Sequence, residues 1–138
     1  MNTLISTRYT APAVDGALLL LRIGVAVLMI PHGLQKFNGF EKMQHEFVNF
    51  MGLGPKVSLA MAMSAELGCS LLLLVGLFTR VAASLLIITM LTALFMAHQG
   101  ALFGDGEKNG LFILLFLVLL IMGPGEYSLD ARLGKRRF

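Results

Sequence analysis

VSLAMAMSAELGCSLLLLVGLF (residues 57–78) and VAASLLIITMLTALFMA (residues 81–97) are two apolar stretches that only Thr79 and Arg80 separate. The first stretch carries one charge, Glu66, and the second carries none. A bilayer core of about 30 Å takes about 20 helical residues, so the first stretch is long enough to cross it and the second nearly so. The two-residue connection predicts that the two helices form a tight antiparallel hairpin.

Two further apolar stretches flank this hairpin. Residues 17–34 contain one charge, Arg22, and one proline, Pro31. Residues 111–122 are wholly apolar but number only 12, so they can span only if the helix extends back through Glu107 and forward to Pro124. We therefore expect an all-α membrane protein, a single domain over residues 1–138 folded as an antiparallel bundle of four transmembrane helices. The expected spans are about 17–36, 57–78, 81–98 and 106–124.

The composition supports a membrane protein. Of the 138 residues, 57% are hydrophobic and 14% are charged, and the mean hydropathy is +0.80. Soluble domains are about 45–50% apolar and about 25% charged, so this composition disfavours a water-soluble globule. A disordered chain is excluded, because polar, uniformly charged stretches are absent. A single cysteine, Cys69, excludes a disulfide scaffold. The net charge of +3 is assigned to contacts with anionic lipid rather than nucleic acid, because the basic residues lie in loops and at the C-terminus.

The segment between the first and second spans, Phe40 to Met51, places apolar residues at helical spacing among charged ones. This pattern predicts an amphipathic helix in the membrane interface. The N-terminus is not expected to be a cleaved signal peptide, because Arg22 interrupts the apolar region and no small-residue cleavage site follows. The first span is therefore expected to be retained.

The basic residues predict the orientation. With four spans both termini lie on one side, and that side carries six basic residues: Arg8, Arg80, Arg132, Lys135, Arg136 and Arg137. The other side carries four: Lys36, Lys42, Lys56 and Lys108. The positive-inside rule then places both termini in the cytoplasm.

Glu66 is the most informative polar residue. It lies near the middle of the second span, in a stripe of small or polar residues at i, i+4 spacing with Ser58, Ala62 and Ser70. Small residues allow a neighbouring helix to approach, so the carboxyl group is expected to face protein rather than lipid. A partner such as Arg22 or His32 would keep it ionised. Two interpretations stay open: a structural ion pair that fixes helix register, and a carboxylate that handles protons or binds a ligand.

Other polar residues are expected in the same half of the bundle. His32 and Lys36 share a helix face at the end of the first span, His98 ends the third, and Glu107 begins the fourth. Arg22, nearer the cytoplasmic end, is expected to extend its side chain to the interface rather than to pair with Glu66.

No metal site is predicted, since the chain has no tight ligand spacing such as His-Glu-x-x-His. Haem bound by His32 and His98 is conceivable but disfavoured, because two histidines near an interface are common. Cys69 is expected to be a small buried packing residue.

Several short motifs resemble the DoxX family of small four-span bacterial inner-membrane proteins. They are Leu21-Arg22-Ile23-Gly24, His32-Gly33 with Lys36-Phe37, Glu66-Leu67-Gly68, Gly76-Leu77-Phe78-Thr79-Arg80 and Gly123-Pro124-Gly125-Glu126-Tyr127-Ser128-Leu129-Asp130. The resemblance implies a four-helix bundle in the inner membrane. It also implies a link to quinone-dependent redox chemistry and to redox-defence partner enzymes, although the paired cysteines of related thiol oxidoreductases are missing.

The leading functional hypothesis is a redox-associated membrane subunit, with or without its own enzyme activity, that binds a quinone-like lipid near Glu66, His32 and His98. Glu107, Lys36 and Arg22 are further candidates for cofactor binding. The alternative is a non-catalytic scaffold whose polar residues only fix helix packing; a solute carrier would require a dimer. Expected partners are the lipid bilayer, a redox partner protein and a second copy of the chain, but not nucleic acid.

Overall fold

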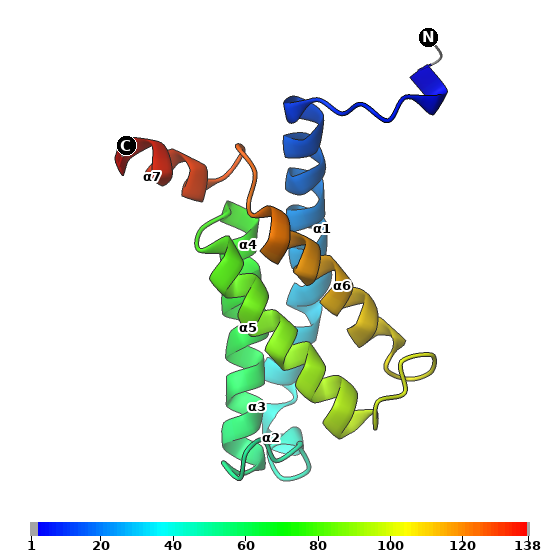
Figure 1. The fold of residues 1–138 in the computed structure, drawn as a ribbon. Coiled ribbons are helices and arrows are strands. Elements are labelled where there is room, and N and C mark those ends of the chain that lie inside the picture. The colour runs from blue at the N-terminus through cyan, green and yellow to red at the C-terminus, as the bar shows by residue number, and fades with distance from the viewer. Residues whose placement is uncertain (1–2, 138) are drawn as a thin grey trace.

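The computed structural model describes residues 3–137, with side chains described for residues 4–135, and within this range it is helical with connecting loops and no strand (Figure 1). The helices are η1 (Thr3–Ile5), α1 (Ala11–Asn38), α2 (Phe40–Met43), α3 (Pro55–Ser64), η2 (Ala65–Cys69), α4 (Ser70–Val75), α5 (Thr79–Thr92), η3 (Ala93–Ala97), α6 (Glu107–Met122) and α7 (Leu129–Arg137). The short element η1 is a 3₁₀-helix, whereas η2 and η3 are π-helical segments inside longer helices.

Among the described residues, three helices are long and apolar enough to cross a membrane. They are Ala11–Asn38 with 28 residues, Pro55–Val75 with 21 and Thr79–Ala97 with 19. The fourth apolar helix, α6, has 16 residues, which at about 1.5 Å each give about 24 Å. The expected extension to Pro124 is not helical, because α6 ends at Met122 and the next residue, Gly123, has a φ of +85° that breaks the helix. The all-helical membrane class is thus confirmed, with three full-length candidate spans rather than four.

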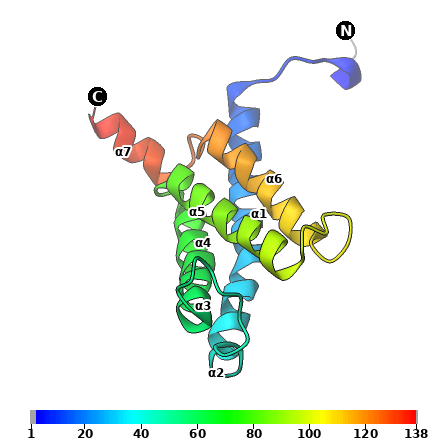
Figure 2. The same cartoon turned by 60° about the horizontal axis from the view of Figure 1, so that its bottom comes forward.

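The helices pack side by side in the order of the chain (Figures 1 and 2). The segment formed by α3, η2 and α4 lies along α1, and α5 packs against η2, α4 and α6. Helices η1 and α7 lie at one end of the molecule, and α2 lies at the other. The core between the helices consists mainly of small and branched side chains: Leu18, Val25, Ala26, Met29, Cys69, Leu73, Ala82, Ala83, Leu86, Met90, Phe112, Phe116 and Leu119.

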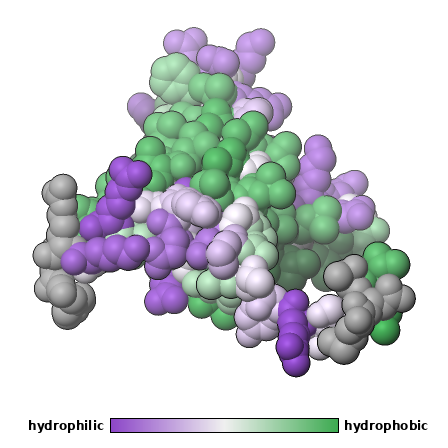
Figure 3. Space-filling view, turned by 90° about the horizontal axis from the view of Figure 1, so that it is seen from above, coloured by the Kyte–Doolittle hydropathy of each residue, from purple (hydrophilic) through white to green (hydrophobic). Residues whose placement is uncertain are grey.

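The outer surface is strongly apolar. Large side chains on every long helix are exposed, as expected where lipid replaces water: Leu20, Val27, Leu28, Leu71, Val81, Ile88, Leu114 and Ile121. Figure 3 looks down on the end that carries both termini, and there hydrophilic residues gather on the near face with hydrophobic surface behind them. This distribution fits helices that lie in a membrane and present a polar end to water.

The hairpin turn lies three residues earlier than the sequence suggested. Helix α4 ends at Val75, Gly76 adopts φ +73° in the left-handed region, and α5 begins at Thr79. Thr79 and Arg80 therefore form the first turn of α5 rather than the connection. The Asp130 carboxylate supports this start from far along the chain, since its oxygens accept hydrogen bonds from the backbone N–H of Phe78 at 2.8 Å and of Thr79 at 2.9 Å.

The expected interfacial helix over Phe40 to Met51 is wrong in extent. Helix α2 covers only Phe40–Met43, and the chain then turns through residues 44–54. Local side-chain contacts hold this loop: Asn49 Oδ1 accepts a hydrogen bond from the Gly54 N–H at 2.9 Å, and Ser58 Oγ accepts one from the Phe50 N–H at 2.8 Å. These bonds stabilise the loop without a helix. Met43, Phe47 and Phe50 of the segment are half-buried, whereas Met51 is 81% exposed.

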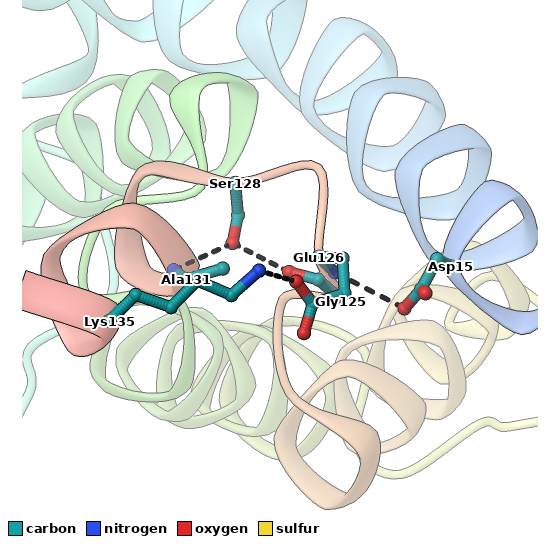
Figure 4. Close-up of polar contacts among 6 residues, drawn as sticks. All are labelled: Asp15, Gly125, Glu126, Ser128, Ala131 and Lys135. Carbon is teal, nitrogen blue, oxygen red and sulfur yellow. Dashed lines mark hydrogen bonds and ion pairs between the residues drawn. The ribbon is translucent and has the colours of Figure 1, made fainter. Parts of the chain in front are cut away.

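A loop after α6 closes the end of the molecule that carries the termini (Figure 4). The Asp15 carboxylate accepts a hydrogen bond from the Glu126 N–H at 3.2 Å, and the Ser128 hydroxyl donates to Gly125 O at 2.7 Å. Glu126 also pairs with Lys135 at 2.6 Å, and this contact raises the pKa of the exposed Lys135 ammonium. The loop is thereby fixed to both α1 and α7.

Candidate functional site

The central ion pair of the protein joins Lys36 on α1 to Glu66 in η2. The Lys36 Nζ atom lies 2.9 Å from both carboxylate oxygens of Glu66. The Glu66 side chain is 2% exposed and that of Lys36 is 18% exposed. At this depth the ammonium compensates for the water that burial removes from the carboxylate. Glu66 therefore faces protein, as predicted, but its partner is Lys36 rather than Arg22 or His32.

A close helix contact brings the two residues together. A Cβ atom added to Gly33 would lie 2.6 Å from Leu67 Cγ, so only glycine allows η2 to approach α1 this closely. Gly33 lies one turn before Lys36, and Leu67 follows Glu66. The predicted small and polar stripe is also confirmed on this face, since Ser58 and Ser70 are buried along with Glu66. The Gly33 contact thus positions the ion pair.

Glu66 lies in a π-helical segment. Residues Ala65–Cys69 form η2, and the Ser70 hydroxyl donates a hydrogen bond to the backbone carbonyl of Glu66. A second π-helical segment, η3, ends the third long helix directly before His98. π-Bulges within α-helices occur frequently at functional sites, because the extra residue redirects a side chain. Both segments border the same cavity.

This cavity has a volume of about 1380 Å³, and residues of α2 and α3 contribute to its lining. Helices α2 and α3 lie toward the end of the molecule opposite the termini (Figure 1). Five of the six sequence candidates line the cavity: His32 and Lys36 from α1, Glu66 from η2, His98 after η3, and Glu107 at the start of α6. The structure therefore brings these residues to one site. Apolar side chains from α3 and α5 that are about half exposed also line it: Val57, Met61, Leu85 and Ile88. Their exposure means that the cavity opens through the lipid-facing surface.

Aromatic contacts orient His32. Its imidazole ring meets Phe112 of α6 edge to face, with ring centroids 5.6 Å apart and an interplanar angle of 89°. Phe112 in turn stacks on Phe116 with centroids 5.9 Å apart. Because these rings are fixed in the core, the imidazole is held at the cavity wall.

Arg22, the sixth candidate, lies away from this cavity. Its guanidinium is buried and donates hydrogen bonds to Pro124 O and Tyr127 O, both at 2.7 Å. The expectation that it extends to the interface is wrong, because two backbone carbonyls of the loop after α6 replace water. Arg22 therefore holds that loop against α1.

Several other residues of the cavity were not predicted as site residues from the sequence. The segment expected at the membrane interface supplies Met43, Phe47 and Phe50, and α6 supplies Asn109, whose Nδ2 atom is buried without a hydrogen-bond partner. The sequence does contain an indication for Asn109. The apolar run of residues 111–122 is too short to cross a membrane, so the fourth span must begin earlier and include Asn109. Within residues 3–137, no group of three histidine, cysteine or acidic side chains could hold a metal ion.

Comparison with known proteins identifies the family. The sequence model of the DoxX family matches residues 17–99, more than half of the chain. The chain belongs to the DoxX family. No solved structure gives a significant match.

Relatives of this DoxX protein cover most of its length. Inner membrane protein YphA of Escherichia coli is 32% identical, over 83% of this chain and 89% of the relative. Inner membrane protein YqjF of the same organism is 33% identical, over 88% and 95%. A Bacillus subtilis protein named "Putative oxidoreductase CatD" is 31% identical, over 81% and 83%. The named relatives thus include inner-membrane proteins and one protein named for redox activity.

Proposed function

We propose that this DoxX protein is a redox-associated subunit of the bacterial inner membrane that binds a quinone-like lipid in the cavity beside Glu66, His32 and His98. The observation that carries the proposal is the convergence of these residues with Lys36 and Glu107 on one large cavity. The name of the relative from Bacillus subtilis adds support for a redox role.

The chemistry of the cavity fits a quinone head group. A quinone presents two carbonyl oxygens, which need hydrogen-bond donors and, on reduction, a source of protons. His32 and His98 can donate, and the Glu66–Lys36 pair can hold or release a proton. When bound, a quinone supplies redox chemistry of two electrons and two protons. The apolar walls from α3 and α5 suit an isoprenoid tail, and the surface opening lets a lipid enter sideways.

The charge of the cavity favours a neutral ligand. The charged side chains that line it are two lysines, Lys36 and Lys108, and three acids, Glu66, Asp105 and Glu107. With neutral histidines their formal charge is −1, and Lys36 is already neutralised by Glu66. A phosphate head group would meet repulsion in such a site, whereas a neutral carbonyl would not. The charge of the cavity therefore favours a neutral carbonyl lipid over an anionic phospholipid.

The membrane arrangement that accompanies this function has four spans, with α6 crossing together with its flanking loops. Both termini then lie in the cytoplasm, as the basic residues Arg8, Arg80 and Arg132 favour. Helix α7 and the N-terminal segment lie at the same end of the molecule, which supports an even number of crossings. In this orientation the cavity lies in the periplasmic half of the bilayer.

Electrons must come from another protein under this proposal. Cys69 is the single cysteine and is buried in the core, as predicted, so dithiol chemistry within one chain is unavailable to it. We therefore propose a redox partner protein at the membrane surface. A second copy of the chain is a further proposed partner.

The test is titration of the purified protein in mild detergent with a short-chain ubiquinone analogue, followed by calorimetry. Wild type should bind one quinone per chain, and Glu66→Gln should lose binding while keeping its helical circular dichroism. Glu41→Gln, on the exposed helix α2, is the matched control and should bind as wild type. A folded Glu66→Gln variant that binds normally would falsify the assignment of Glu66.

A non-catalytic scaffold is the second candidate, and the closeness of the Lys36–Glu66 pair favours it. The pair lies beside the tight contact of Gly33 with Leu67, where an ion pair can fix helix register. The double swap Lys36→Glu/Glu66→Lys separates the candidates, because it restores the pair with reversed positions. A scaffold regains the wild-type Tm and association with its partner, whereas a quinone site stays defective in binding.

A further inference from the structure

Asn109 is a polar residue of the cavity with an unused hydrogen-bond donor. It follows Lys108 in the first turn of α6 and lines the cavity. Its Nδ2 atom is buried, and no atom of the described chain accepts a hydrogen bond from it. Two other donors that line the cavity already have acceptors: Lys36 donates to Glu66, and Ser58 donates to the Gly54 carbonyl.

An unused buried donor is unfavourable for the protein alone. Leaving a buried polar group without its partner costs about 1–3 kcal/mol, and almost all buried polar groups in native proteins are paired. A site of this kind is therefore better explained by an acceptor that arrives with a ligand. The terminal torsion of asparagine has a broad energy profile, so a small rotation turns the amide into the cavity.

We infer that Asn109 is a binding residue that donates a hydrogen bond from Nδ2 to a neutral carbonyl oxygen of the cavity ligand. The inference rests on the proposed quinone site and adds the residue that recognises one carbonyl of the head group. An amide donor is suited to this task, because it carries no charge that would demand an anionic ligand. The negative balance of the cavity lining points the same way.

Asn109 and the ion pair reach the cavity from different helices, because α6 supplies the asparagine whereas α1 and η2 supply Lys36 and Glu66. Phe112, one turn further along α6, contacts His32 of α1. The ligand head group is thus held from two sides, by Asn109 on α6 and by the polar groups on α1 and η2. The hydrogen bond from Asn109 also favours a lipid with a carbonyl group over a pure hydrocarbon, which has no acceptor.

The experiment uses the full chain in detergent and a short-chain benzoquinone labelled with ¹³C at its carbonyl carbons. Infrared difference spectra report the carbonyl stretch, and calorimetry reports Kd. In wild type one carbonyl should show the lowered frequency of a hydrogen-bonded group. Asn109→Leu should remove this shift and weaken binding about fivefold to tenfold, the loss of one neutral hydrogen bond. Asn109→Asp, which keeps the size but replaces the donor with an acceptor, should weaken binding at least as much.

A stability measurement without ligand separates binding from folding. Because Asn109→Leu removes an unpaired buried donor, the Tm of the ligand-free variant should equal or exceed that of wild type. Asn38→Leu, at the exposed end of α1, is the control and should leave both carbonyl frequency and Kd unchanged.

The outcomes distinguish this inference from the proposed function. If wild type binds no quinone, the proposed site itself is wrong and this role for Asn109 falls with it. If wild type binds quinone and Asn109→Leu shows the same carbonyl frequency and Kd, only the role of Asn109 is overturned. A lower Tm of ligand-free Asn109→Leu with unchanged carbonyl frequency also overturns it, because the residue is then structural.

Discussion

The ammonium of Lys36 lies 2.9 Å from both oxygens of the Glu66 carboxylate, and this contact joins the first long helix to the π-helical segment of the second. The pair lines the cavity. The pair can therefore contribute to two properties that can be measured separately. Any ion pair at this position would contribute to stability, whereas ligand binding depends on which chemical groups line the cavity.

Removing the carboxylate charge should lower stability. Glu66→Gln leaves the Lys36 ammonium without its counter-charge, and breaking a buried pair in this way costs about 3–5 kcal/mol. Because the Lys36 side chain is 18% exposed and partly hydrated, we expect a smaller loss, about 2 kcal/mol. Thermal unfolding in detergent should show a lower Tm for Glu66→Gln than for Glu41→Gln. Equal Tm values for the two variants would mean that the ion pair contributes nothing to stability.

Substitution of Arg22 should destabilise the protein without affecting the cavity. Its guanidinium donates to two carbonyls, Pro124 O and Tyr127 O, and lysine cannot reproduce this fork. Arg22→Lys should therefore lower the free energy of unfolding by about 1–3 kcal/mol. The Kd for a short-chain quinone should stay unchanged, because Arg22 does not line the cavity.

Arg132→Lys, at an exposed position on α7, is the matched control for Arg22→Lys and should have little effect. A large change in quinone affinity in folded Arg22→Lys would contradict the separation of the two ends of the molecule.

A side chain at Gly76 should disrupt the hairpin. Gly76 adopts φ +73°, and an added Cβ atom would lie 2.5 Å from Ser128 Cβ and 2.8 Å from Arg22 Nη1. Gly76→Ala therefore combines backbone strain with a clash, and we expect a loss of about 2 kcal/mol or more in stability. Gly24→Ala, inside α1 with no atom within 4 Å of the added Cβ, should be neutral or stabilising by about 0.5 kcal/mol. Chemical denaturation of both variants measures the difference; similar stabilities would refute the predicted clash.

Hydrophobic patterning was sufficient to predict much of the fold. The long apolar runs predicted the helices at Pro55–Val75 and Thr79–Ala97, and the charge-poor run around Arg22 predicted α1. The predictions were wrong where backbone conformation and local hydrogen bonds determine the structure. The left-handed conformation of Gly76 moved the hairpin turn, and the side chains of Asn49 and Ser58 stabilised a loop where a helix was expected.

The site was predicted in part. Depth and helical spacing were enough to place His32, Lys36, Glu66, His98 and Glu107 in one half of the molecule, and all five line the cavity. The pairing of residues was not predictable, because it depends on which helices are neighbours and how closely they approach. The Gly33 contact with Leu67 brings Lys36 to Glu66, whereas the loop after α6 occupies Arg22.

The most direct measurement of the central claim is mass spectrometry of the lipids that co-purify with the protein from its native membrane in mild detergent, together with a visible spectrum. The account predicts a quinone in about equimolar amount with the chain, strongly reduced in Glu66→Gln and retained in Glu41→Gln. A colourless protein that carries only bulk phospholipid, in wild type and variants alike, would contradict the quinone site and favour the scaffold.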